Sequence, residues 1–144
     1  MKASEIRVGQ RPQSLLEVVN LVNAGQSDFG EALAEFLDEA KKMDATCLAA
    51  SLAKAPGWLR DDNPHDANWQ DAYLAATAEH LSRAAGIAIP AWTEQGDRFL
   101  SRAWFDNQGL QSLNAMMLAQ SPLAFRRRFI FTEAHPFAAS LNRI

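Results

Sequence analysis

The sequence predicts an all-α protein, organised as a single-domain bundle of about five to seven helices with extended connectors. Apolar residues recur at steps of three and four over several segments. Serine or aspartate stands at capping positions before those segments. A chain of 144 residues is long enough for one buried core and short for two. We therefore expect one helical domain over residues 1–144, with residues 1–12 as a flexible lead-in.

The first helix is expected at about 15–24. Ser14 and Glu17 have the spacing of a capping box, in which the serine accepts the amide of the third helical residue. Gly25 ends the helix, because glycine readily adopts the left-handed conformation that helix ends favour. The buried side of this helix is predicted to contain Leu15, Val18, Val19 and Val22.

Two further helices follow from similar signals. Asp28 and Glu31 repeat the capping spacing before an amphipathic stretch whose opposite face is acidic. The third helix begins after Asp44 and ends before Pro56–Gly57. It contains Cys47, whose alanine and leucine neighbours favour a buried small hydrophobic residue over a reactive thiol.

The longest helix is expected over about 66–85, because apolar residues keep a helical spacing there until Gly86. His80 lies on its apolar line and is predicted to be a core histidine. Residues 87–90 are too short for a sheet strand and end in a proline, so we expect an extended buried connector.

The C-terminal part is predicted from shorter signals. Short helices are expected at 98–105 and 110–120. Ser121–Pro122 has the preferred order of N-cap and first helical residue, and it opens a helix that holds the three arginines 126–128. Two last pieces are expected: a strand-like or irregular segment at 129–131 and a helical turn at 136–142.

Charge is unevenly distributed along the chain. Fourteen Lys and Arg against seventeen Asp and Glu give a net charge of −3, which argues against a protein that coats nucleic acid. Residues 1–100 hold nine basic and fifteen acidic residues, and residues 101–144 hold five and two. The basic C-terminal corner contains Arg126, Arg127 and Arg128, which could bind carboxylates or phosphates. Alternatively, some of these arginines join the C-terminal segment to acidic helices within the monomer.

The densest group of metal-ligand or acid–base side chains is the loop Asp61–Asp66. Asp62, His65 and Asp66 could coordinate a hard divalent ion, as in a small metal-dependent enzyme. Acidic residues before a helix also stabilise its N-terminus without binding any ligand. The chain contains no nucleophile elbow, P-loop or dinucleotide fingerprint, so we expect no catalytic residue and no cofactor.

We therefore expect a non-enzymatic protein-interaction or regulatory protein. Arg126, Arg127 and Arg128 are candidates to pair with carboxylates of a protein partner, and Trp104 and Phe105 are candidate apolar anchors. A DNA-associated regulator that uses the basic corner is an alternative, and a homo-oligomer is compatible with either. The single cysteine and the absence of an apolar run of about 18 residues favour a cytoplasmic protein without membrane contact.

Several segments also carry a resemblance to a known group of proteins. The most specific are Ala103–Phe105 and the run Ser121–Arg128, which reads Ser-Pro-Leu-Ala-Phe-Arg-Arg-Arg, and Glu35–Glu39 is a weaker one. In these segments the chain resembles a family of small uncharacterised bacterial all-helical proteins, some of them associated with toxin–antitoxin-type nucleotidyltransferases. The resemblance implies an accessory, antitoxin-like or regulatory role. The sequence departs from the family pattern at Ala40 and Phe129.

Overall fold

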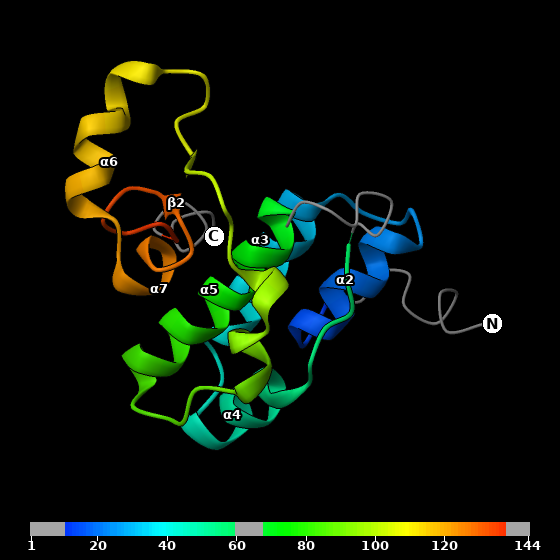
Figure 1. Ribbon diagram of the computed structural model, residues 1–144. Coiled ribbons are helices and arrows are strands. Elements are labelled where there is room, and N and C mark those ends of the chain that lie inside the picture. The colour runs from blue at the N-terminus through cyan, green and yellow to red at the C-terminus, as the bar shows by residue number, and fades with distance from the viewer. Residues whose placement is uncertain (1–10, 60–67, 138–144) are drawn as a thin grey trace. The chain divides into compact units, whose positions relative to one another are not determined.

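The computed structural model describes residues 11–59 and 68–137 (Figure 1). In these ranges the chain is all-α, with six α-helices and one sheet of two short strands, which confirms the predicted fold class. The described residues group into two compact units, one ending at Leu59 and the other covering 68–137. The single domain stays a prediction, because compactness does not measure whether two units fold cooperatively.

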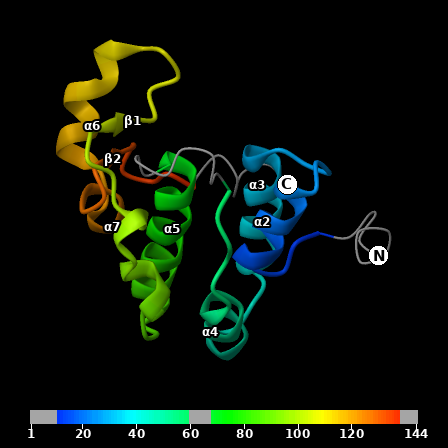
Figure 2. The ribbon, with the colours of Figure 1, turned by 45° about the vertical axis from the view of Figure 1, so that its right-hand side comes forward.

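The first unit contains three helices: α2 (Leu15–Asn23), α3 (Phe29–Ala40) and α4 (Ala45–Ala53). Each begins at its predicted cap, where the side chain of Ser14, Asp28 or Asp44 accepts a backbone amide three residues further on. Helices α2 and α3 pack side by side (Figure 2). The buried apolar side chains of the two helices include Leu15, Val18, Val19, Ala32 and Phe36.

The turn between α2 and α3 follows the expected geometry. Gly25 has a φ of +75°, and its amide donates to the carbonyl of Val22. The amide of Gln26 donates to the carbonyl of Leu21, which completes the helix end. Val22 was predicted to be buried at the end of α2. In the structure Leu21 is buried there and Val22 is half-buried.

Cys47 does not occupy the buried position predicted for it. It is exposed in the first turn of α4, where its backbone amide donates to the carboxylate of the cap residue Asp44. The negative charge of Asp44 raises the pKa of the Cys47 thiol, so the thiol is not activated as a nucleophile. The prediction was wrong because Cys47 and Ala50, one turn apart, lie on the exposed side of α4, whereas Leu48 and Leu52 lie on its buried side.

The second unit is built around α5 (Trp69–Ala85). Its cap is Asn68, whose side chain accepts the amides of Gln70 and Asp71, and it ends at Gly86 with a φ of +70°. Every residue from Asp71 to Glu79 is buried, a property of helices that are covered on all faces. Three elements of the same unit pack on α5: η1 (Ala91–Glu94), η2 (Gly96–Arg98) and α7 (Leu123–Arg126).

The helix predicted over 98–105 is wrong. The short helix η2 ends at Arg98, and Trp104–Phe105 form the strand β1, which pairs in parallel with β2 (Ile130–Phe131). Aromatic residues favour strands once a partner strand is present, and that partner lies about 26 residues further along the chain. The strand-like character predicted for 129–131 is confirmed by β2.

The helix predicted over 110–120 is present as η3 (Gln111–Leu113) followed by α6 (Asn114–Gln120). Ser121, which was expected to cap the next helix, instead fastens α6 to the residue after β2. Its hydroxyl lies 2.6 Å from the carbonyl of Met117 and accepts the amide of Thr132 at 2.8 Å. Pro122 is the cap of α7, which has no side-chain cap bond.

Residues 87–90 and the C-terminal turn are two further predictions that the structure bears on. Residues 87–90 are extended as expected, but they are half-buried, with Ala88 exposed, where a buried connector was predicted. Most of the predicted turn at 136–142 lies outside the described residues. None of the helices in the described ranges has the length and apolar character needed to cross a membrane.

Candidate functional site

The three consecutive arginines occupy three different environments. Arg126 is the last residue of α7, Arg127 caps that helix, and Arg128 follows. Successive residues of a helical turn point about 100° apart, so the three side chains diverge. Arg126 and Arg127 are exposed as residues, whereas Arg128 is fully buried.

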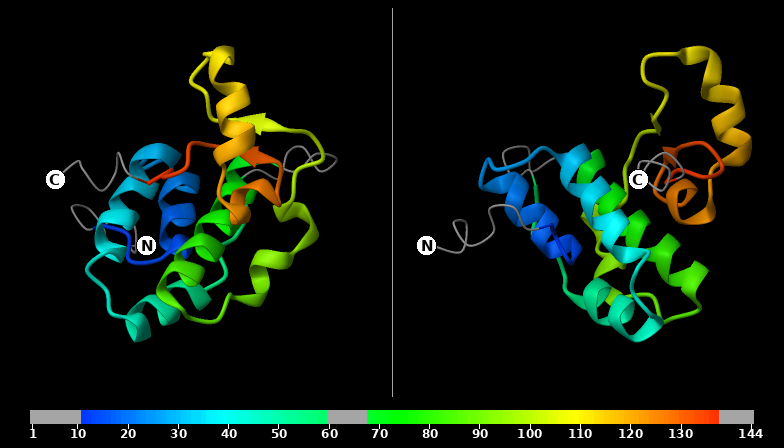
Figure 3. Two further views of the ribbon diagram at one scale, coloured as in Figure 1. Left: turned by 90° about the vertical axis from the view of Figure 1, so that its left-hand side faces the viewer. Right: turned by 180° about the vertical axis from the view of Figure 1, so that it is seen from behind.

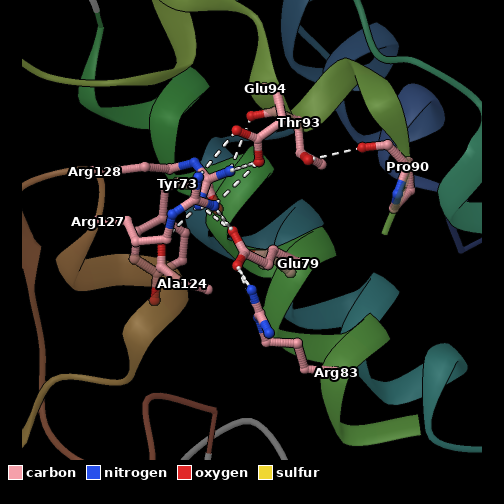
Figure 4. A network of polar contacts seen from close by, with 10 residues as sticks. Tyr73, Glu79, Arg83, Pro90, Thr93, Glu94, Ala124, Arg127 and Arg128 are labelled. Atoms are coloured by element: carbon pink, nitrogen blue, oxygen red, sulfur yellow. Dashed lines mark hydrogen bonds and ion pairs between the residues drawn. The ribbon is translucent and has the colours of Figure 1, made fainter. Parts of the chain in front are cut away.

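Glu79 of α5 is the centre of a buried ionic cluster (Figure 4). Its Oε1 accepts hydrogen bonds from Arg128 at 2.7 Å and from Arg127 at 2.6 Å, and its Oε2 accepts from Arg83 at 2.8 Å. Burial raises the pKa of Glu79, but the hydrogen bonds from Arg128, Arg83 and Arg127 outweigh it and lower that pKa below its ordinary value. We call these four residues the Glu79 cluster.

Arg128 has the most enclosed guanidinium of the cluster. Besides Glu79, it donates to the carbonyls of Ala124 at 2.7 Å and Thr93 at 2.9 Å. The guanidinium carbon lies 4.6 Å from the centroid of the Phe99 ring. Burial lowers the pKa of Arg128, although Glu79 opposes that effect. Arg128 therefore ties the segment after α7 to both α5 and η1.

Arg127 links the cluster to the surface. It donates to both carboxylate oxygens of Glu94, at 3.0 and 3.1 Å. These hydrogen bonds raise the pKa of Arg127 above its ordinary value. The side chain of Glu94 is half exposed. The internal alternative from the sequence thus describes Arg127 and Arg128, which pair with acidic residues of their own unit.

Arg126 has a different role from its two neighbours. Its guanidinium donates to the carbonyls of Leu118, Ala119 and Ser121, at 2.7, 3.2 and 3.0 Å. These carbonyls lie at the C-terminal end of α6, where a positive charge is favourable. Among the residues that the structure describes, no carboxylate forms an ion pair with Arg126.

The two predicted apolar anchors take part in ring contacts of the second unit. Trp104 stacks on Trp69 of α5, with ring centroids 4.1 Å apart and planes 8° apart. Phe105 stacks on Phe131 of β2, with centroids 5.1 Å apart. Both anchors are half-buried, and their contacts fix β1 against α5 and β2.

A second buried arginine was not predicted from the sequence. Arg98 is fully buried, 3.9 Å from a carboxylate oxygen of Asp71, and donates to the Asp71 carbonyl at 3.4 Å. Its guanidinium carbon lies 5.0 Å from the centroid of the Trp92 ring. Burial lowers the pKa of Arg98 to about 10. These contacts hold η1 and η2 on α5.

Exposed apolar side chains gather on the segment around α6. Among the described residues, six large apolar side chains are exposed, and five of them lie between residues 110 and 129. We call these five the α6 surface: Leu110, Met116, Leu118, Leu123 and Phe129. This surface was not predicted from the sequence, although the sequence contains a signal for it: the 19 residues from 107 to 125 include no Asp, Glu, Lys or Arg.

Helix α6 is thinly packed on the rest of its unit. Met117 is its one buried residue, and its main neighbours are η3 and β2. In both views of Figure 3, α6 projects from the second unit. The bonds of Ser121 and Arg126 fasten its C-terminal end. The structure therefore anchors α6 and leaves most of its side chains in solvent.

Phe129 has an unusual backbone for an aromatic residue. Its φ of +64° lies in the left-handed region, which costs a residue with a Cβ about 1–2 kcal/mol. Its neighbours Arg128 and Ile130 are both fully buried, so the chain turns at Phe129 and leaves that side chain 46% exposed. Strained residues of this kind are concentrated at functional positions.

The candidate metal ligands Asp62, His65 and Asp66 lie outside the described residues. Within 11–59 and 68–137, no three side chains of His, Cys, Asp or Glu are grouped closely enough to hold a metal ion. The metal-dependent alternative therefore stays a prediction from the sequence.

Comparisons of the chain with protein-family models, curated proteins and solved structures found no match.

Proposed function

We propose that this chain is a non-enzymatic protein-interaction protein and that the α6 surface is its binding surface. The observation that carries the proposal is the exposure of five large apolar side chains on and beside a segment without charge. Solvent-facing helices of soluble proteins ordinarily carry charged residues. The cores of protein interfaces are instead depleted of charge and enriched in methionine and aromatic residues.

In this proposal the arginines position the binding surface. Arg127 and Arg128 fix the segment after α7 to Glu79, and Arg126 fixes the end of α6. Arg126 also supplies a positive charge at the rim, where a partner carboxylate would add specificity more than affinity. A DNA-associated regulator would need the arginines to meet phosphates, and the carboxylates of Glu79 and Glu94 compete for two of them.

A regulatory role in the cytoplasm is part of the same proposal. The resemblance to small bacterial helical proteins implies an accessory or antitoxin-like role, and such a role requires a surface for another protein. The single cysteine agrees with a reducing compartment.

The proposal is tested by photo-crosslinking in the native cells. A photoreactive phenylalanine analogue replaces Leu118 in one variant and the exposed Ala50 of α4 in a control variant. We expect a discrete protein adduct at position 118, identified by mass spectrometry, that is lost when Met116→Lys is added. Adduct yields at 118 no higher than at 50 would contradict the proposal.

A further inference from the structure

We infer that the α6 surface pairs with the α6 surface of a second copy of this chain, an inference that rests on the proposed function and names its partner. A symmetric dimer places one surface against itself, so every charged group near the axis meets a like charge. Charged residues make up 22% of this chain, and residues 107–125 include none. A partner recognised through opposite charges would instead be matched by charged residues on this surface.

The polar residues on the segment are also suited to self-pairing. Gln111 and Gln120, at the two ends of the η3–α6 stretch, are both exposed. A side-chain amide donates and accepts hydrogen bonds, so amides of two copies can bond to one another across a two-fold axis. Carboxylates and ammonium groups lack this property at neutral pH. The amides at the two ends of the η3–α6 stretch can therefore pair with their own counterparts in a second copy.

The shape of α6 favours close approach of a second helix. Ala115 and Ala119 are exposed one turn apart, with the larger Met116 and Leu118 beside them. Small residues reduce the distance between the axes of packed helices, and the neighbouring long side chains then fill the space on either side. Because α6 projects from its unit (Figure 3), its exposed side is accessible to another molecule.

The inference is tested with two oppositely charged double variants of the full chain, M116E/L118E and M116K/L118K. Sedimentation velocity is measured from about 1 µM to about 100 µM, the range in which dimers of ordinary affinity dissociate. We expect wild type to shift from monomer to dimer, and each variant alone to stay monomeric at every concentration. An equimolar mixture of the two variants forms the dimer again at low salt, because opposite charges then face each other.

Matched controls carry the same charges on α4, where Ala50 and Ala53 are exposed. The variants A50E/A53E and A50K/A53K are expected to dimerise as wild type does. Circular dichroism checks that all variants keep their helical content. If α6 loses its helix in the double variants, Leu123→Glu and Leu123→Lys give the same mixing experiment from the exposed first residue of α7.

The outcomes separate the dimer from the interaction proposal. Wild type that stays monomeric, or double variants that dimerise like wild type, would overturn the inference. A mixture of the two variants without recovery of the dimer would overturn it as well, since it excludes pairing of this surface with itself. An adduct at position 118 with a different protein would leave the proposed function standing without the dimer, and absence of any adduct there would remove both.

Discussion

At the residue scale, Glu79 is the buried carboxylate at which three arginines of the second unit meet. It is fully buried and accepts hydrogen bonds from Arg83, Arg127 and Arg128. Removing one partner of a buried ion pair leaves an uncompensated charge in a medium that solvates it poorly. Exposed ion pairs contribute far less, because water and salt screen them.

We expect Glu79→Gln to lower the free energy of unfolding by about 3 kcal/mol, since Arg128 keeps its charge and loses its nearer carboxylate, while Glu94 lies 3.7 Å away. Urea denaturation followed by circular dichroism measures this loss. Glu94→Gln is the control, with an expected loss of at most about 1 kcal/mol because Glu94 is half exposed. Similar losses in the two variants would show that the Glu79 cluster is not a buried ionic centre.

The stability of the second unit is also expected to depend on His80. This residue packs edge-on against Phe125 and Phe137, with ring centroids 5.8 and 5.5 Å apart. Burial, and then the positive charge of His135, lowers the pKa of His80. The unfolded chain therefore binds a proton at a higher pH than the folded chain does, and stability is lost as the pH falls through the folded-state pKa.

The corresponding experiment measures the free energy of unfolding between about pH 7 and pH 5, where histidine ordinarily titrates. We expect wild type to become less stable as the pH falls, and His80→Gln to show a weaker dependence. The exposed His135 gives the control His135→Gln, which retains most of the wild-type dependence. A slope in His80→Gln as steep as in wild type would assign the effect to other groups.

At the element scale, the predicted caps Ser14, Asp28 and Asp44 located the starts of the first three helices, and Gly86 located the end of the fourth, because those signals act within one turn of the chain. The strand β1 could not be found in the same way. Trp104–Phe105 have no local strand partner, and the pairing with Ile130–Phe131 exists only after the chain has folded back. The hydroxyl of Ser121 likewise meets Thr132, 11 residues further along the chain, and does not cap α7 as predicted.

The turn that follows α7 gives a prediction in which stability and association change in opposite directions. Asparagine adopts the left-handed conformation with less strain than phenylalanine does. We therefore expect Phe129→Asn to raise the free energy of unfolding by up to about 1 kcal/mol and to weaken self-association. Thermal and urea denaturation measure the first change, and sedimentation measures the second.

Gln108 provides the control for this experiment, because its φ of 54° is also left-handed and its side chain is polar and exposed. Gln108→Asn is expected to relieve strain without affecting association. If Phe129→Asn left association unchanged, Phe129 would not belong to the binding surface.

At the scale of the whole molecule, the two halves of the chain differ in charge and in the use made of it. Residues 1–100 have a net negative charge and include the acidic face of α3 with Glu31 and Glu35. Residues 101–144 have a net positive charge, and two of their arginines form ion pairs with the buried Glu79. Two arginines of the basic corner predicted from charge counting, Arg127 and Arg128, are therefore paired with carboxylates of their own unit. Arg126 and the five apolar side chains of the α6 surface remain exposed.

The metal-dependent alternative is decided by titrating metal-free full-length protein with Mg²⁺, Mn²⁺ and Zn²⁺ in a calorimeter. For an interaction protein we expect no stoichiometric binding heat. Heat that corresponds to one ion per chain, and that is lost in Asp62→Asn and Asp66→Asn, would favour the enzyme instead.

The sequence by itself determined the all-α class, the caps at Ser14, Asp28 and Asp44, and the helix ends at Gly25 and Gly86, because these depend on interactions between residues close in the chain. It also left open whether the arginines are internal or exposed. Only the tertiary structure decided that Arg127 and Arg128 meet Glu79, which lies 48 and 49 residues away. It also decided which apolar side chains of the uncharged segment remain in solvent, since burial depends on the neighbours that folding supplies.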